Sequence, residues 1–164
     1  GVVFDVSYAL TEQTQLVAFA HSDQIHSRQA GSQLFAQPDW FASNRDSADV
    51  LGLSLRHAAI KDKLDVGGDL TLSRSRSKVT VDTGASNPLF PVASTALDSL
   101  KLFATYKLDK SLSLTAAYWF ERYDSRDWKQ DGVQPATIPN VLAYGEQPPN
   151  YRVNVLRLGM RYQF

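Results

Sequence analysis

Hydrophobic and polar residues alternate with a period of two along most of this 164-residue chain. The clearest runs begin at Val2, Leu64, Leu100, Leu112 and Leu156. Such alternation places one set of side chains on an apolar face of a β-sheet and the other set on a polar face. Two weaker runs span Gln15–Ser22 and Val50–His57. The pattern predicts an all-β, antiparallel fold with about seven strands of roughly 8 to 13 residues and no helix.

The predicted connections alternate between short and long. Short turns are expected at Thr11–Thr14, Ala58–Lys63 and Asp109–Ser111, and long loops at Asp23–Ser47, Lys78–Asp98 and Asp124–Asn150. All 7 prolines fall in the long segments. Proline has no backbone N–H for a β-ladder, so this distribution supports the boundaries. Short turns at one rim and long loops at the other are typical of outer-membrane β-barrels.

The solvent that meets the apolar face decides between two folds. In a soluble sandwich or lipocalin-like barrel that face packs inward, whereas in a membrane barrel it meets lipid. Three features favour lipid: a charge-rich polar set, aromatic residues near the ends of the runs, and a terminal strand that closes on Tyr162 and Phe164. These two aromatic residues resemble the assembly signal of outer-membrane barrels. The charged set is Asp5, Arg56, Asp65, Asp69, Lys101, Lys107, Glu121, Arg157 and Arg161.

Composition narrows the functional classes. The chain has 17 basic and 17 acidic residues, and this balance argues against nucleic-acid binding. It has no cysteine, which excludes disulfides, thiolate metal sites and covalent haem attachment through this chain. The mean hydropathy is −0.27, and no run approaches the roughly 18 apolar residues of a spanning helix.

Five charged residues are the best candidates for lining a barrel lumen: Lys101, Lys107, Glu121, Arg157 and Arg161. A lysine or arginine facing lipid at the bilayer midplane would cost about 2–4 kcal/mol. Cross-strand ion pairs between them would contribute less than about 1 kcal/mol each. The lipid cost therefore predicts that these side chains face an enclosed interior.

The odd number of predicted strands indicates whether the chain could form a whole barrel. With the last strand descending to the periplasm, all three short turns are periplasmic and Gly1 lies on the extracellular side. A single-chain barrel has an even number of strands, and an open sheet edge is not viable in lipid. We therefore expect residues 1–164 to be the C-terminal segment of one larger outer-membrane barrel domain. The alternative is an eight-strand barrel with one more strand within Asp23–Ser47.

The end of the chain resembles the decahaem-associated outer-membrane barrels of the MtrB/PioB family. The residues that carry the resemblance are Pro148-Pro149, Tyr151, Val153-Asn154-Val155 and the closing Arg161-Tyr162-Gln163-Phe164. The segment Tyr106–Tyr123, followed by Trp128, is also similar. Together they cover about a third of the chain.

This resemblance implies a Gram-negative outer-membrane barrel that sheathes a periplasmic multihaem c-type cytochrome and forms the structural part of an extracellular electron-transfer conduit. The partner carries the haem, so no cofactor, metal or catalytic residue is expected in this chain, which is not an enzyme. An extracellular multihaem cytochrome is a second possible partner. Alternatives are a diffusion porin, a small eight-strand barrel enzyme or adhesin, and a soluble ligand-binding barrel.

Other groups of residues are less specific. His21, His26 and His57 are read as surface imidazoles rather than ligands. The basic strand end at Arg74, Arg76 and Lys78 is either a solvated end or a contact with lipopolysaccharide phosphates or an outer partner. The loop containing Asp124, Arg126, Asp127 and Asp131 has no complete calcium motif. Candidates for docking an extracellular cytochrome are Phe35, Trp40 and Phe41 in the loop Ser32–Asn44, and Trp128.

Overall fold

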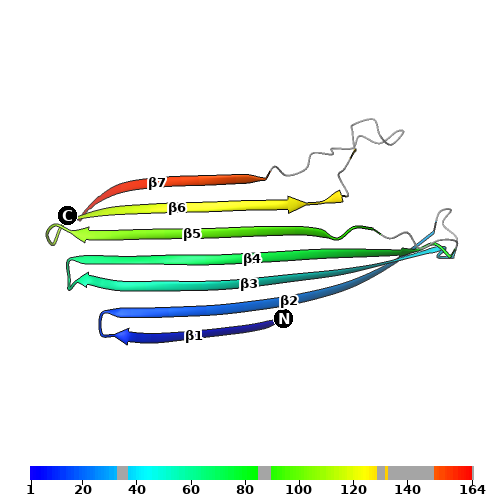
Figure 1. Ribbon diagram of the computed structural model, residues 1–164, viewed down its shortest axis with the longest axis horizontal. Coiled ribbons are helices and arrows are strands. Elements are labelled where there is room, and N and C mark those ends of the chain that lie inside the picture. Colours follow the sequence, from blue (N-terminus) through cyan, green and yellow to red (C-terminus); the bar gives the residue numbers. More distant parts are fainter. Residues whose placement is uncertain (33–36, 85–89, 129–131, 133–149, 164) are drawn as a thin grey trace.

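A computed structural model of the chain describes residues 1–32, 37–84, 90–128, 132 and 150–163. Seven strands form one antiparallel sheet in chain order (Figure 1). Their bounds are β1 Val2–Thr11, β2 Thr14–Gly31, β3 Trp40–Ile60, β4 Leu64–Asp82, β5 Ala93–Lys107, β6 Leu112–Arg126 and β7 Tyr151–Tyr162. None of the described residues forms a helix long and apolar enough to cross a membrane. The predicted all-β fold with seven strands is confirmed.

The three short turns lie together at one end of the sheet, as predicted (Figure 1). In the turn between β3 and β4, Asp62 has a φ of 62°, a left-handed conformation that aspartate tolerates better than most residues. In the turn between β5 and β6, the carboxylate of Asp109 accepts hydrogen bonds from the backbone N–H groups of Ser111 and Leu112. Local side-chain hydrogen bonding of this kind stabilises tight turns.

At the opposite end of the sheet, here called the outer end, the strands are longer than the sequence predicted. The expected loop Asp23–Ser47 is largely strand, because β2 continues to Gly31 and β3 begins at Trp40. The segment Lys78–Asp98 is likewise shortened, since β4 runs to Asp82. The hydrophobic period fades there because polar residues occupy both faces of the extensions. The alternative prediction placed an extra strand within Asp23–Ser47. The described residues of this segment form no extra strand; they belong mostly to β2 and β3.

The cross-strand register separates the side chains into two chemically different faces. Phe4, Leu51, Leu70, Leu102 and Leu156 lie on one side, here called the apolar face. All nine charged residues of the predicted polar set lie on the other side, here called the polar face. The apolar face has no covering layer: Leu156, Leu158 and Met160 are 72%, 74% and 72% exposed.

The strands are staggered along the sheet. Thr14, the first residue of β2, shares a row across the sheet with His57, Val66 and Ala104, and the row reaches Ala116 in β6. Ala116 lies four positions into β6, which begins at Leu112. Four residues of about 3.4 Å across four strand spacings of about 4.8 Å give a slant of roughly 35°. Strands of membrane barrels tilt by about 35–45° from the barrel axis.

The sheet is open in this structure. The two outermost strands, β1 and β7, each pair with one neighbour, β2 and β6. Ala93 is the one hydrophobic residue that is buried among the described residues. The apolar side chains therefore do not pack against one another in a closed centre, as they would in a soluble sandwich.

Candidate functional site on the polar face

The middle of the polar face contains a linked group of charged and aromatic side chains on β3, β4 and β5. The guanidinium of Arg56 lies 2.8 Å from a carboxylate oxygen of Asp69 on β4. The hydroxyl of Ser54 donates a 2.7 Å hydrogen bond to the same carboxylate. Arg56 also stacks over the Phe103 ring, 4.6 Å from its centroid. Cation–π contact and ion pairing together hold this guanidinium against the sheet.

Glycines leave room for the aromatic rings on this face. A Cβ at Gly67 would overlap the Phe103 ring, and a Cβ at Gly52 would overlap the ring of Phe19, which lies opposite it on β2. Each ring therefore lies flat over a neighbouring strand. Aromatic residues that cover glycines in this way help to fix strand register.

A second linked group lies on β5, β6 and β7. The ammonium of Lys101 lies 4.8 Å from the centroid of the Trp119 ring, and the Trp119 indole donates a hydrogen bond to the Ser99 hydroxyl. The Tyr151 hydroxyl donates a 2.6 Å hydrogen bond to Glu121. The Tyr151 ring also stacks on Tyr123, with centroids 5.2 Å apart.

The register brings the five lumen candidates to the same face. Lys101 and Glu121 belong to the second group. The ammonium nitrogen of Lys107 lies 3.8 Å from a carboxylate oxygen of Asp65. Arg157 and Arg161 lie opposite Ala117 and Ser113, nearer the short turns. That these residues line a lumen stays a prediction. The sequence pattern places Phe103 and Trp119 in the polar sets of their runs but does not single them out, or Phe19, as site residues. Aromatic residues in an otherwise polar set are the signal that could have identified them.

The outer edge of the apolar face carries its own ion pairs. The guanidinium of Arg74 on β4 lies 2.6 Å from a carboxylate oxygen of Asp98 on β5. The guanidinium of Arg122 lies 2.7 Å from a carboxylate oxygen of Asp124 on the same strand, β6. Arg74 and Asp124 lie in the row just outside the leucines. Asp98 and Arg122 lie one row farther in, in the same row as Leu72. Pairing lowers the cost of placing each charge next to apolar surroundings.

The docking candidates are not arranged as the sequence predicted. Trp40 and Phe41 do not lie in a loop: they begin β3, and they lie on opposite faces, with the Trp40 ring over Gly31. Trp128 follows β6 and stacks on Phe90, with centroids 4.7 Å apart. Phe35 lies outside the described residues.

Of the predicted assembly signal, Tyr162 ends β7 on the apolar face opposite Leu112, and Phe164 lies outside the described residues. The three histidines lie apart. His57 is bonded to the Thr14 hydroxyl and His26 to the Ser43 hydroxyl, while His21 and His26 lie on opposite faces of β2.

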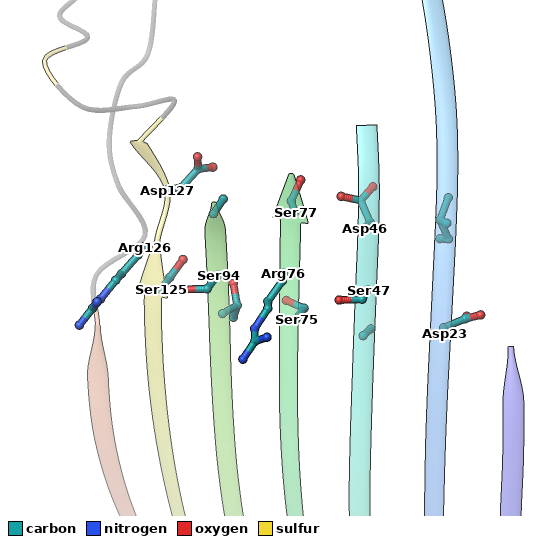
Figure 2. Close-up of a pocket in the computed structure, with 14 residues that line it drawn as sticks. Asp23, Asp46, Ser47, Ser75, Arg76, Ser77, Ser94, Ser125, Arg126 and Asp127 are labelled. Carbon is teal, nitrogen blue, oxygen red and sulfur yellow. The ribbon is translucent and has the colours of Figure 1, made fainter. Parts of the chain in front are cut away.

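At the outer end of the sheet, a shallow hollow is lined by residues of β2 to β6 and the residue after β6 (Figure 2). Its polar residues include Asp23, Asp46, Ser75, Ser77 and Asp127. No group of three or more histidine and carboxylate side chains in the described ranges is placed to hold a metal ion. Asp131, part of the weighed calcium loop, lies outside those ranges.

Comparison with known proteins identifies the family. A family model for outer membrane beta-barrel porins, MtrB/PioB, matches residues 1–164. The chain is also 28% identical over 160 residues to outer membrane protein MtrB of Shewanella baltica (strain OS185), an alignment that covers 97% of this chain and 23% of that protein. The chain thus spans about a quarter of the length of this relative. Slanted strands, a bare apolar face and a charged opposite face agree with this match. The chain therefore belongs to the MtrB/PioB family of porin-like outer-membrane β-barrels, a family of structural proteins rather than enzymes.

Proposed function

We propose that this chain forms part of the wall of an outer-membrane barrel that encloses a multihaem c-type cytochrome, as the structural part of a conduit for extracellular electron transfer. The apolar face meets lipid and the polar face meets the guest protein. Haem is carried by the guest, and the chain supplies insulation, depth and orientation. The unpaired edges of β1 and β7 are completed by further strands, because open edges are not viable in lipid.

The observation that carries this proposal is the composition of the polar face. Large aromatic rings alternate there with charged side chains: Phe19, Phe103, Trp119, Tyr123 and Tyr151 lie among Arg56, Asp69, Lys101 and Glu121. Aromatic residues and arginine are enriched at protein–protein interfaces. Phe19 and Phe103 also fix strand register by covering glycines, but Trp119, Tyr123 and Tyr151 cover none of the described glycines, and a column of water makes no use of their apolar surface. The polar face therefore fits a protein guest better than a column of water.

The wall of such a barrel has to hold the guest protein in one position. Electron transfer between haems requires each donor and acceptor to stay at a fixed separation, so the guest must be held in one position. Side chains that are already immobilised lose little rotamer entropy when they bind a partner. Arg56 and Lys101 are held by Phe103 and Trp119, which prepares the face for binding.

Substitutions on the two faces of the same strands test the proposal in the full-length protein. Phe103→Ala with Trp119→Ala removes two rings from the polar face. The matched control, Leu102→Ala with Phe120→Ala, removes two side chains at adjacent positions from the apolar face. Outer membranes are solubilised and the barrel is purified. The readouts are haem absorbance per barrel and electron transfer to an acceptor dye enclosed in proteoliposomes.

We expect haem absorbance per barrel to fall at least threefold in the polar-face variant. The rate of electron transfer to the acceptor dye should fall by a similar factor. The control should retain both per folded barrel, with folding scored by heat-modifiable electrophoretic migration. A wild-type protein that purifies without haem and conducts ions freely across a planar bilayer would instead support a diffusion porin.

A further inference from the structure

The extensions of β3 and β4, together with the outer end of β6, bring four basic residues onto one face of the sheet. Arg76 shares a row with Ser47, Ser94 and Arg126. In the next row outward, Arg45 lies directly opposite Lys78. Arg45, Arg76, Lys78 and Arg126, here called the basic cluster, are all exposed. Arg45 and Lys78 are about 5 Å apart, and Lys78 and Arg76 about 7 Å. Arg126 lies two strands from Arg76, about 10 Å away, so these long side chains can reach one ligand that carries more than one phosphate.

The basic cluster lies on the apolar face, beyond the leucine-rich part and the row of Arg74 and Asp124 that borders it. Leu72 is the last leucine of that face on β4, and Arg76 and Lys78 follow it by four and six residues. At about 3.4 Å per residue, they lie roughly 14 and 20 Å farther along a slanted strand. The short turns of outer-membrane barrels face the periplasm, so this end lies in the outer leaflet at the level of the lipid headgroups.

The charges of the cluster are not neutralised within the described part of the chain. One and two rows inward on the same face, Arg74 pairs with Asp98, and Arg122 pairs with Asp124. No carboxylate among the described residues lies within ion-pair distance of a member of the basic cluster. Like charges that lie directly opposite on a sheet repel each other, so the Arg45–Lys78 pair is unfavourable until an anion lies between its members.

The other face of the same extensions has the opposite character. Asp23 and Asp46 lie there among polar residues such as Ser75 and apolar residues such as Ile25 and Val79. None of the described residues on this face of the extensions is a lysine or arginine. Figure 2 shows the Arg76 and Arg126 side chains extending away from the carboxylates of Asp46 and Asp127. Positive charge is thus confined to the face that continues the lipid-facing surface.

We propose that the basic cluster binds the phosphate groups of lipopolysaccharide, the phosphorylated glycolipid of the outer leaflet. The three arginines supply planar, paired N–H donors and Lys78 supplies a compact ammonium, a combination suited to phosphate. The leucines below the cluster contact the acyl chains of the same lipid. On the same face of β2, His26 lies opposite Arg45 and extends the site sideways, and Arg28 extends it one row outward. The inference uses the face assignment of the proposed function but does not depend on a cytochrome in the lumen.

The test uses the full-length protein in detergent micelles stripped of endogenous lipid. The probe is bisphosphorylated lipid A, and the readout is its apparent affinity from thermal-shift titration. Two variants are compared with wild type: the double variant Arg45→Gln, Lys78→Gln, and a quadruple variant that adds Arg76→Gln and Arg126→Gln. The matched control, Arg157→Gln with Arg161→Gln, removes two positive charges from the polar face. Dephosphorylated lipid A and inorganic phosphate are run as separate probes.

We expect affinity for bisphosphorylated lipid A to fall at least threefold in the double variant and at least tenfold in the quadruple variant. The polar-face control should stay within twofold of wild type. Dephosphorylated lipid A should bind wild type at least tenfold more weakly, and raised salt should weaken the phosphorylated probe.

Equal binding of the phosphorylated and dephosphorylated lipids, or unchanged affinity in a folded double variant, would overturn the proposal. So would inorganic phosphate that stabilises wild type as strongly as lipid A, since the ligand would then be free phosphate. Haem per barrel is measured on the same samples. Loss of lipid binding with haem retained, or the reverse, separates this site from the proposed cytochrome sheath.

Discussion

Lys101 of β5 lies directly opposite Trp119 of β6, with its ammonium nitrogen 4.8 Å from the centroid of the indole ring. The next residue on β5, Leu102, points to the other face and is 46% exposed. Two consecutive residues therefore meet different surroundings, and substitutions at this step of the strand measure which surroundings each face has.

Leu102→Arg is expected to impair assembly more than Lys101→Leu. An arginine that faces lipid near the midplane costs about 2–4 kcal/mol. Removing the lysine forfeits a cation–π contact of about 0.5–2 kcal/mol. Urea unfolding of the full-length protein in micelles, together with the amount of folded barrel in the outer membrane, measures both effects. Equal losses in the two variants would argue against the assigned faces.

Gly52→Val is expected to destabilise the sheet by about 1–3 kcal/mol, because its side chain would enter the space of the Phe19 ring. Phe19→Ala in the same molecule frees that space, so the double variant should recover part of the loss. A double-mutant cycle by urea unfolding measures this coupling. Additive effects of the two substitutions would show that the ring and the glycine do not share one site.

Asp98→Asn is expected to cost about 1–3 kcal/mol, because it leaves Arg74 without its carboxylate at the border of the apolar face. Replacing both residues by leucine should be much less damaging, because no unpaired charge is then left beside the apolar face. Thermal unfolding of the single and double variants in the same detergent makes the comparison. A double variant less stable than Asp98→Asn would contradict this reasoning.

Trp128→Leu is expected to loosen the outer segments by removing the stack on Phe90. An aromatic pair of this kind is worth about 0.5–1.5 kcal/mol, which corresponds to a roughly two- to tenfold larger open population. Limited proteolysis of intact cells, followed at the segments next to Phe90 and Trp128, reports the change. Trp119→Leu, on the polar face, serves as the control and should leave those cleavage rates unchanged.

The membrane-spanning part of this fold could be predicted from the sequence because lipid on one side and a polar interior on the other impose a strict two-residue period. That period located all seven strands, their short turns and both faces. It also assigned Asp69 and Lys101 to the same face, which the register confirms.

The outer parts could not be predicted in the same way. From Asp23 to Gly31 both faces of β2 carry polar residues, so no alternation marks the strand. For the same reason the sequence places Trp40 in a loop, whereas it begins β3. The stack between Phe90 and Trp128 joins two segments without any periodic signal. The run of Arg74, Arg76 and Lys78 was visible, but Arg45 and Arg126 join it only through the register of neighbouring strands.

The extra length of β2, β3 and β4 makes the outer rim uneven. These strands pair as far as Phe41 and Asp82, well past the first residue of β5, Ala93, which lies opposite Ser77 (Figure 1). The three strands therefore extend beyond their neighbours at the outer end of the sheet. In the orientation of the proposed function, these longer strands form a step in the outer rim, and the height of the step limits how closely a partner protein can dock over β5 to β7.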